Sequence, residues 1–157
     1  MTFKRELSML SEAQKSVINE AVSILSDLYK REDLLVESPS DVKTFCRLQI
    51  GHLEHEVFGI LFLDNRHRLI KFSQLFRGTI NVTSVYPREV VKEALIVNAA
   101  AVVFTHNHPS GDCEPSRADK GITKCLFDAL DLFDIRVLDH IVVSCKDSYS
   151  FSEHGLL

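Results

Sequence analysis

The sequence predicts an α/β sandwich, because segments with helical and with strand-like patterns alternate along most of the chain. Of the 157 residues, 45% are hydrophobic and 25% are charged, which is ordinary for a globular domain with one core. Apolar residues recur at helical spacing in some segments and form short β-branched and aromatic runs in others. Helices placed between strands are typical of layered α/β folds.

The first expected helix is amphipathic and precedes the body of the fold. Ser11 opens an S-x-x-Q capping box, and apolar residues follow at helical spacing until Tyr29. After a charged stretch, "KRED", Pro39 marks the start of a second helix that continues through the segment "SPSDVKTFCRLQI". The "SPS" segment therefore predicts a boundary between a short N-terminal helical arm, residues 1–36, and a domain of residues 37–157.

The body is expected to begin as sheet and to continue with helices between strands. The expected strands are 57–64, 68–72, 75–83, 99–105 and 135–144, with a short strand or tail in 148–157. The expected helices after the first two are 87–99, which has proline at its first turn, and 116–132, which has an apolar inner face. Residues 99–105 form a short, largely apolar run that ends in β-branched and aromatic residues, as in an interior strand.

Charge and cysteine content narrow the classes of protein. The net charge of -4 and the pI near 6.0 provide no basic field for nucleic acid, and the basic cluster in "NRHRLIK" is expected to be a solvated hairpin end. The four cysteines form no CxxC pair and no apolar leader is evident, which favours a cytoplasmic protein with reduced thiols. The longest nearly apolar run is about half the ~20 residues of a membrane span, so no membrane association is expected.

A candidate metal site lies in "FTHNHPSGDCEPSRAD". His106 and His108 are two residues apart at a strand end, so their side chains project to the same side. Ser116 and Asp119 are three apart on the first turn of the next helix and face the same way. Each half alone has a plain structural explanation, polar loop histidines in one case and a capping box in the other. Together, two histidines and one aspartate leave a fourth position for water, as catalytic zinc does, and they do not exclude manganese or iron.

The combination His-x-His-Pro, six residues, Ser-x-x-Asp resembles the JAMM (MPN-plus, Mov34-type) metallopeptidases. The segments "NVTSVYPREVVKEAL", "NAAAVVFTHNHPSG" and "IRVLDHIVV…SFSEHGLL" resemble the bacterial RadC branch, over roughly residues 38–157. The resemblance implies an α/β/α sandwich with a mixed central sheet, layered like cytidine deaminases. It also implies one Zn²⁺ per chain, held by His106, His108 and Asp119. Longer RadC proteins carry a helix-hairpin-helix-like region, which the short arm does not match.

The resemblance further implies zinc-dependent hydrolysis of a peptide or isopeptide bond. The family pattern Glu-x-x-Gly-x-Leu matches "EVFGIL", so Glu56 is the expected general base, and Glu54, one pleat earlier, is the alternative. Ser116 is the expected hydrogen-bond donor to the tetrahedral oxyanion. Cys113 is expected to stay outside the metal shell. His140 is not expected to be a ligand, and either supports the site from behind or ends a strand.

Other zinc patterns do not fit the sequence. His52 and His55 in "HLEHE" complete neither HExxH nor HxxEH, and the P-C-x-x-C segment of zinc deaminases is absent from the sequence. Two other functions remain open: a binding module whose metal site is mainly structural, and a DNA-repair or mobile-element role implied by the RadC resemblance. The complete ligand set favours hydrolysis of an unknown protein or peptide substrate. The N-terminal helix could pair two copies in a homodimer.

Overall fold

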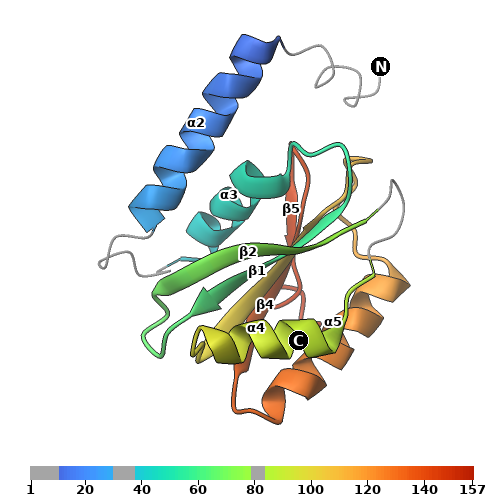
Figure 1. The fold of residues 1–157 in the computed structure, drawn as a ribbon. Helices are drawn as coiled ribbons and strands as arrows, with labels where there is room; N and C mark the ends of the chain where they lie inside the picture. The colour runs from blue at the N-terminus through green and yellow to red at the C-terminus, as the bar shows by residue number, and fades with distance from the viewer. Residues whose placement is uncertain (1–10, 30–37, 79–83) are drawn as a thin grey trace.

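The computed structural model describes residues 11–29, 38–78 and 84–157, and these form one mixed sheet with helices on both faces (Figure 1). The helices are α2 (Glu12–Tyr29), α3 (Pro39–Ile50), α4 (Pro87–Ile96) and α5 (Arg117–Asp131). The strands are β1 (Val57–Leu63), β2 (Leu69–Arg77), β3 (Ala101–Asn107), β4 (Arg136–Val143) and β5 (Ser148–Ser150). The predicted α/β fold with a mixed sheet is confirmed.

The sheet has the order β2-β1-β3-β4-β5, and its only parallel pair among the described strands is β3 with β4. Helix α5 makes the crossover between these two strands, as a parallel connection requires. Their register contains one irregularity: Val102 lies opposite Val137, but Val103 lies opposite Asp139, so that Leu138 is an extra residue on β4. Strands β1 and β3 are buried along their whole length, as expected of interior strands.

Two apolar layers hold the helices to the sheet. On one face α3 packs Phe45, Cys46 and Ile50 against inward residues of β1, β3 and β4. On the other face, Val90 and Ala94 of α4 and Leu126 and Leu130 of α5 pack against Phe58, Phe62 and Phe104. Helix α2 lies outside this sandwich beside α3 (Figure 1). Its described side chains, from residue 12 to residue 24, are mostly exposed. No helix of the described segments is long and apolar enough to span a membrane.

The structure differs from the expected elements in two places. The separate strands 68–72 and 75–83 are one strand, β2, because residues 73 and 74 continue the antiparallel pairing with β1; residues 79–83 lie outside the described residues. The helix expected to reach residue 99 ends at Ile96. Asn98 has a positive φ of 52°, a left-handed conformation that asparagine tolerates better than most residues and that cannot continue a helix. The predicted arm boundary at residues 36 and 37 also lies outside the described residues.

Two of the basic side chains near the turn between β1 and β2 form ion pairs with carboxylates of the same chain. The Arg68 Nε lies 2.7 Å from Asp64 Oδ2, and the Lys71 ammonium forms an ion pair with Glu93 of α4. His67 has a φ of 60°, as residues of tight turns often do. These contacts agree with the expected hairpin end.

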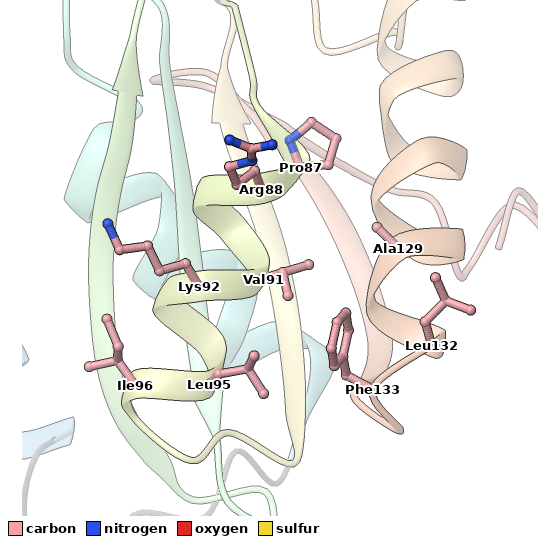
Figure 2. A pocket seen from close by; sticks show the side chains of 9 residues that line it. All are labelled: Pro87, Arg88, Val91, Lys92, Leu95, Ile96, Ala129, Leu132 and Phe133. Atoms are coloured by element: carbon pink, nitrogen blue, oxygen red, sulfur yellow. The ribbon is translucent and has the colours of Figure 1, made fainter.

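An apolar groove runs between the outer sides of α4 and α5, away from the first turn of α5 (Figure 2). Its lining consists of Pro87, Arg88, Val91, Lys92, Leu95, Ile96, Ala129, Leu132 and Phe133. Its lining holds no histidine, cysteine or carboxylate, and so none of the usual ligands of a metal ion.

Candidate metal centre

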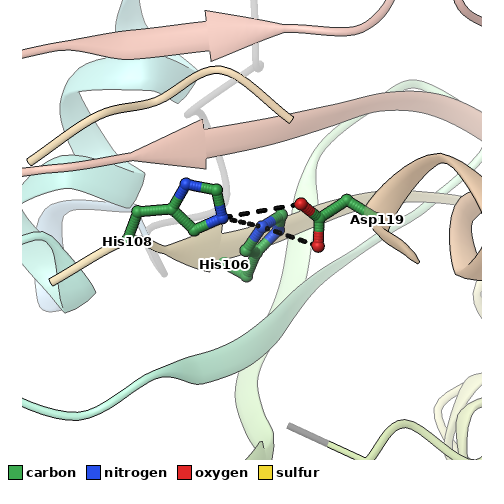
Figure 3. A group of neighbouring side chains, drawn as sticks. All are labelled: His106, His108 and Asp119. Carbon is green, nitrogen blue, oxygen red and sulfur yellow. Dashed lines mark hydrogen bonds and ion pairs between the residues drawn. The ribbon is translucent and has the colours of Figure 1, made fainter. Parts of the chain in front are cut away.

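Three side chains from two elements converge at one end of the parallel strand pair (Figure 3). His106 is the last residue but one of β3, His108 follows the strand directly, and Asp119 lies in the first turn of α5. The two histidine Nε2 atoms are 3.0 Å apart. The His106 Nε2 lies 3.3 Å from Asp119 Oδ1, and the His108 Nε2 lies 3.5 Å from Asp119 Oδ2. The structure thus brings together the three residues that the sequence predicts as ligands.

Local sequence explains how the strand and the helix are brought together. The His108 N–H donates to the Val143 carbonyl at 2.9 Å, which extends the β3–β4 pairing by one residue past the strand. The chain then turns through Gly111, whose φ of 93° suits glycine. At the end of the loop, Ser116 caps α5 and its capping box includes Asp119. A tight loop between a paired strand end and a capped helix start therefore fixes all three side chains.

The capping box also fixes the Asp119 carboxylate. Its Oδ2 accepts hydrogen bonds from the Ser116 N–H at 2.7 Å and from the Ser116 hydroxyl at 2.6 Å. The other oxygen, Oδ1, is the one nearest His106. The hydroxyl hydrogen of Ser116 is therefore engaged with Asp119, so the predicted contact with an oxyanion requires this hydroxyl to rotate. That role of Ser116 stays a prediction.

Electrostatics show that the cluster is arranged around positive charge. Burial alone would raise the pKa of Asp119, but its close contacts with the imidazoles of His106 and His108 hold that pKa far below its ordinary value. The hydrogen bond with Asp119 raises the pKa of His108 above its ordinary value, and the charge of Glu56 contributes in the same direction. A group that stabilises a proton on His108 offers the same stabilisation to a cation.

The donor atoms fit a divalent metal ion. The His108 Nδ1 lies 2.7 Å from the Asp112 carbonyl, which can only accept, so Nδ1 carries the hydrogen and the Nε2 of the neutral ring offers a lone pair. Two imidazole nitrogens and a carboxylate that face one another would stabilise a cation placed among them. Ligand atoms of a tetrahedral zinc with bonds of 2.0–2.1 Å lie about 3.3 Å apart, close to the separations found here. The cluster could therefore hold a metal ion, and these donors do not identify which one.

Glu56 lies immediately before β1, next to this cluster. Its carbonyl accepts from the Gly78 N–H at 2.8 Å, and its charge is one of the causes of the raised pKa of His108. Glu54, the alternative base, lines a hollow that faces Lys15 and Ile18 of α2. The surroundings of the two carboxylates therefore differ, and only the surroundings of Glu56 include a candidate ligand.

Asn107, between the two histidines, is not among the residues that the sequence predicts for the site. Its buried side chain accepts from the Val57 N–H at 2.7 Å and donates to the carbonyls of His55 at 3.0 Å and Leu53 at 3.2 Å. These bonds bind the backbone on both sides of Glu56 to the end of β3. The sequence held one signal for this role of Asn107: it is a polar residue in a buried strand, and strand alternation turns its side chain away from both histidines.

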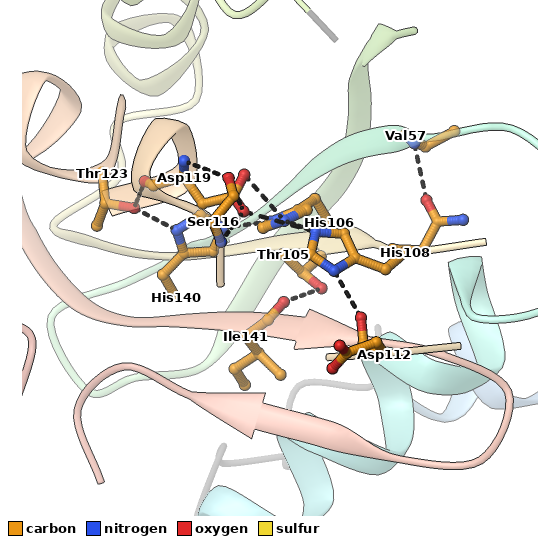
Figure 4. Close-up of polar contacts among 11 residues, drawn as sticks. Val57, Thr105, His106, His108, Asp112, Ser116, Asp119, Thr123, His140 and Ile141 are labelled. Atoms are coloured by element: carbon orange, nitrogen blue, oxygen red, sulfur yellow. Dashed lines mark hydrogen bonds and ion pairs between the residues drawn. The ribbon is translucent and has the colours of Figure 1, made fainter. Parts of the chain in front are cut away.

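His140 is buried on β4, behind His106. Its Nε2 lies 2.8 Å from His106 Nδ1, the ring nitrogen opposite the Nε2 that faces His108 and Asp119 (Figure 4). Cys113 is also buried, against Val142 and Phe151, and burial raises the pKa of its thiol. Neither residue belongs to the group of converging ligand atoms found among the described residues.

Comparison with known proteins agrees with the fold and the site. A family model described as a RadC-like JAB domain matches residues 36–156. The chain belongs to the RadC-like JAB domain family. The resemblance predicted from the sequence is therefore confirmed, and the JAB/MPN superfamily includes metallohydrolases.

The RadC-like domain has similar relatives in several bacteria. A UPF0758 protein of Vibrio cholerae serotype O1 is 54% identical over 99% of this chain and 98% of the relative. A UPF0758 protein of Leptothrix cholodnii is 56% identical over 86% of this chain and 60% of the relative. One from Haemophilus influenzae is 51% identical over 88% of this chain and 64% of the relative. The chain thus spans nearly all of one relative and less than two thirds of the other two. Their names specify no reaction.

Proposed function

We propose that this RadC-like JAB domain is a zinc-dependent hydrolase that cleaves a peptide or isopeptide bond. The observation that carries the proposal is the convergence of His106 Nε2, His108 Nε2 and the Asp119 carboxylate at the end of β3. Three such ligands leave one coordination position open, which distinguishes catalytic from structural zinc sites. The substrate class we propose is a protein or peptide.

A divalent ion at these ligands would lower the pKa of a water and polarise the scissile carbonyl. The chain's own residues supply the remaining steps. Glu56, held beside the ligands by the segment that Asn107 binds, takes the proton from the attacking water and delivers it to the leaving amine. The Ser116 hydroxyl, once rotated from Asp119, donates a hydrogen bond to the developing oxyanion.

Metal content tests the ligand assignment. We expect about one equivalent of zinc in the purified wild-type chain and almost none in His108→Ala, because a site with only two of its three protein ligands binds zinc weakly. His154→Ala removes an exposed imidazole elsewhere and is the matched control. Equal zinc in His108→Ala and His154→Ala would contradict the site.

Hydrolysis tests the assignment of the base. Glu56→Gln should retain zinc and lose cleavage of a peptide panel by about 10²–10⁴-fold, the usual contribution of a general base. Glu54→Gln makes the same chemical change two residues away and should keep activity. The reverse pattern would assign the base to Glu54. Zinc retained by a wild-type chain that cleaves nothing, but unfolds when zinc is removed, would indicate a mainly structural metal site.

A further inference from the structure

We infer that His140 and Thr123 are positioning residues that orient His106 for metal binding and link it to Asp119. This inference rests on the proposed metal site. It comes from a chain of three contacts, two of them buried and the last part-buried: His106 Nδ1 to His140 Nε2 at 2.8 Å, His140 Nδ1 to Thr123 Oγ1 at 2.6 Å, and Thr123 Oγ1 to the Asp119 carbonyl at 2.6 Å (Figure 4).

The hydrogens of this chain can be placed by counting donors. The Asp119 carbonyl can only accept, so the single hydroxyl hydrogen of Thr123 points to it. The Thr123 oxygen must then accept from His140, whose Nδ1 therefore carries a hydrogen. The Nε2 of the neutral His140 is left as an acceptor, so the hydrogen between the two rings belongs to His106 Nδ1. The Nε2 of His106 consequently offers a lone pair towards His108 and Asp119.

The surroundings of His140 favour its neutral form. The ring is fully buried, stacked on Phe151 with centroids 4.7 Å apart, and edge-on to Phe58 and Phe104 at 5.4 and 5.8 Å. A charged ring is disfavoured in such an apolar enclosure. Both nitrogens of a charged ring would also donate, which would force His106 to carry its hydrogen on Nε2 and would abolish its lone pair for a metal.

The chain of contacts reaches two ligands from different elements. His106 lies on β3, whereas the Asp119 carbonyl and the Thr123 hydroxyl lie one turn apart in α5. The same Asp119 faces His106 with its carboxylate at 3.3 Å. His140 and Thr123 therefore hold His106 and Asp119 in place through atoms other than the ones that face the candidate metal position. Histidine ligands of metals commonly donate their second N–H to such a partner, and its loss usually weakens metal affinity by about 10–100-fold.

Thr123→Val and Thr123→Ser form the matched pair that tests this inference. Valine keeps the shape of threonine and removes the hydroxyl, whereas serine keeps the hydroxyl. By competition with a chromophoric chelator, we expect the zinc Kd of Thr123→Val to rise about 10–100-fold and that of Thr123→Ser to stay within about threefold of wild type. Thermal unfolding of both variants without metal shows whether a general loss of stability accompanies the change.

Nitrogen-15 NMR of the histidine rings in the metal-free full chain gives a second readout. In the wild type and in Thr123→Ser, His106 should carry its hydrogen on Nδ1. In Thr123→Val, the His140 Nδ1–H has lost its acceptor. In part of the population the His140 hydrogen should therefore move to Nε2 and donate to His106 Nδ1, which places the His106 hydrogen on Nε2. A wild-type His106 with its hydrogen on Nε2, or a Thr123→Val variant with unchanged tautomers and zinc Kd, would overturn the inference. Failure of the wild type to bind zinc would instead refute the proposed function, and the NMR result would still decide whether the chain of contacts exists.

Discussion

Asn107→Leu should loosen the segment that carries Glu56 while the ligand strand stays in place. Asparagine and leucine have similar sizes, so the main change is the loss of three hydrogen bonds. The Val57 N–H is buried, and leaving it without a partner costs about 1–3 kcal/mol; each of the two part-buried carbonyls costs about 0.5–1.5 kcal/mol. Because water can reach part of this segment, we expect a total loss near 3 kcal/mol in the free energy of unfolding.

Thermal and chemical unfolding measure this loss. For a domain of this size a loss near 3 kcal/mol lowers the Tm by about 6–12 °C. Amide exchange adds local information: the Val57 N–H should exchange at least about tenfold faster, since about 1.4 kcal/mol of local stability is a factor of ten. Gln74→Leu makes a similar change at an exposed position of β2 and should stay within about 0.5 kcal/mol of wild type. An Asn107→Leu variant as stable as this control would refute the reasoning.

Two further predictions concern packing and pH. A Cβ at Gly59 would lie 2.9 Å from the Phe72 ring, so Gly59→Ala should lower the free energy of unfolding by about 1–3 kcal/mol. Adding Phe72→Leu should restore part of that loss in the double variant, and an unchanged free energy of unfolding in Gly59→Ala would show that the ring has room to move. Without metal, the raised pKa of His108 stabilises the fold fully below about pH 6.5, and this stabilisation is lost as pH rises through the pKa of His108 in the folded chain. The lowered pKa of Asp119 acts in the opposite direction: its stabilisation is complete above about pH 4 and is lost only as pH falls far below 4. Zinc replaces the proton on His108, so zinc affinity measured from pH 8 to pH 5 should fall by about tenfold per unit below that raised pKa, and a flat profile would contradict His108 as a ligand.

The ligand geometry could be predicted from the sequence because it depends on short spacings. A separation of two residues on a strand places His106 and His108 on one side, and the capping box that begins at Ser116 places Asp119 at a helix start. The order of elements followed from alternating patterns for the same reason. Where local conformation departs from the pattern, as at the left-handed Asn98, the predicted helix end was wrong.

The supports of the site could not be settled from the sequence, which left two alternatives for His140 and did not single out Asn107, because they depend on long-range register. Asn107 binds residues that lie 50 or more positions earlier in the chain, and His140 lies 34 positions after His106. Neither distance along the sequence carries a spacing rule. Which strands are neighbours, and which residues then face each other, is decided by the packing of the whole sheet.

The extra residue on β4 decides on which side of the sheet His140 lies. Leu138 packs on the α3 side, whereas His140, two residues later, lies with Phe104 on the opposite side, although uninterrupted alternation would put both on one side. Without the irregularity at Leu138, Thr105 rather than Phe104 would lie opposite His140, and the imidazole would point into the layer beneath α3. A single inserted residue on β4 therefore gives His106 its neighbour.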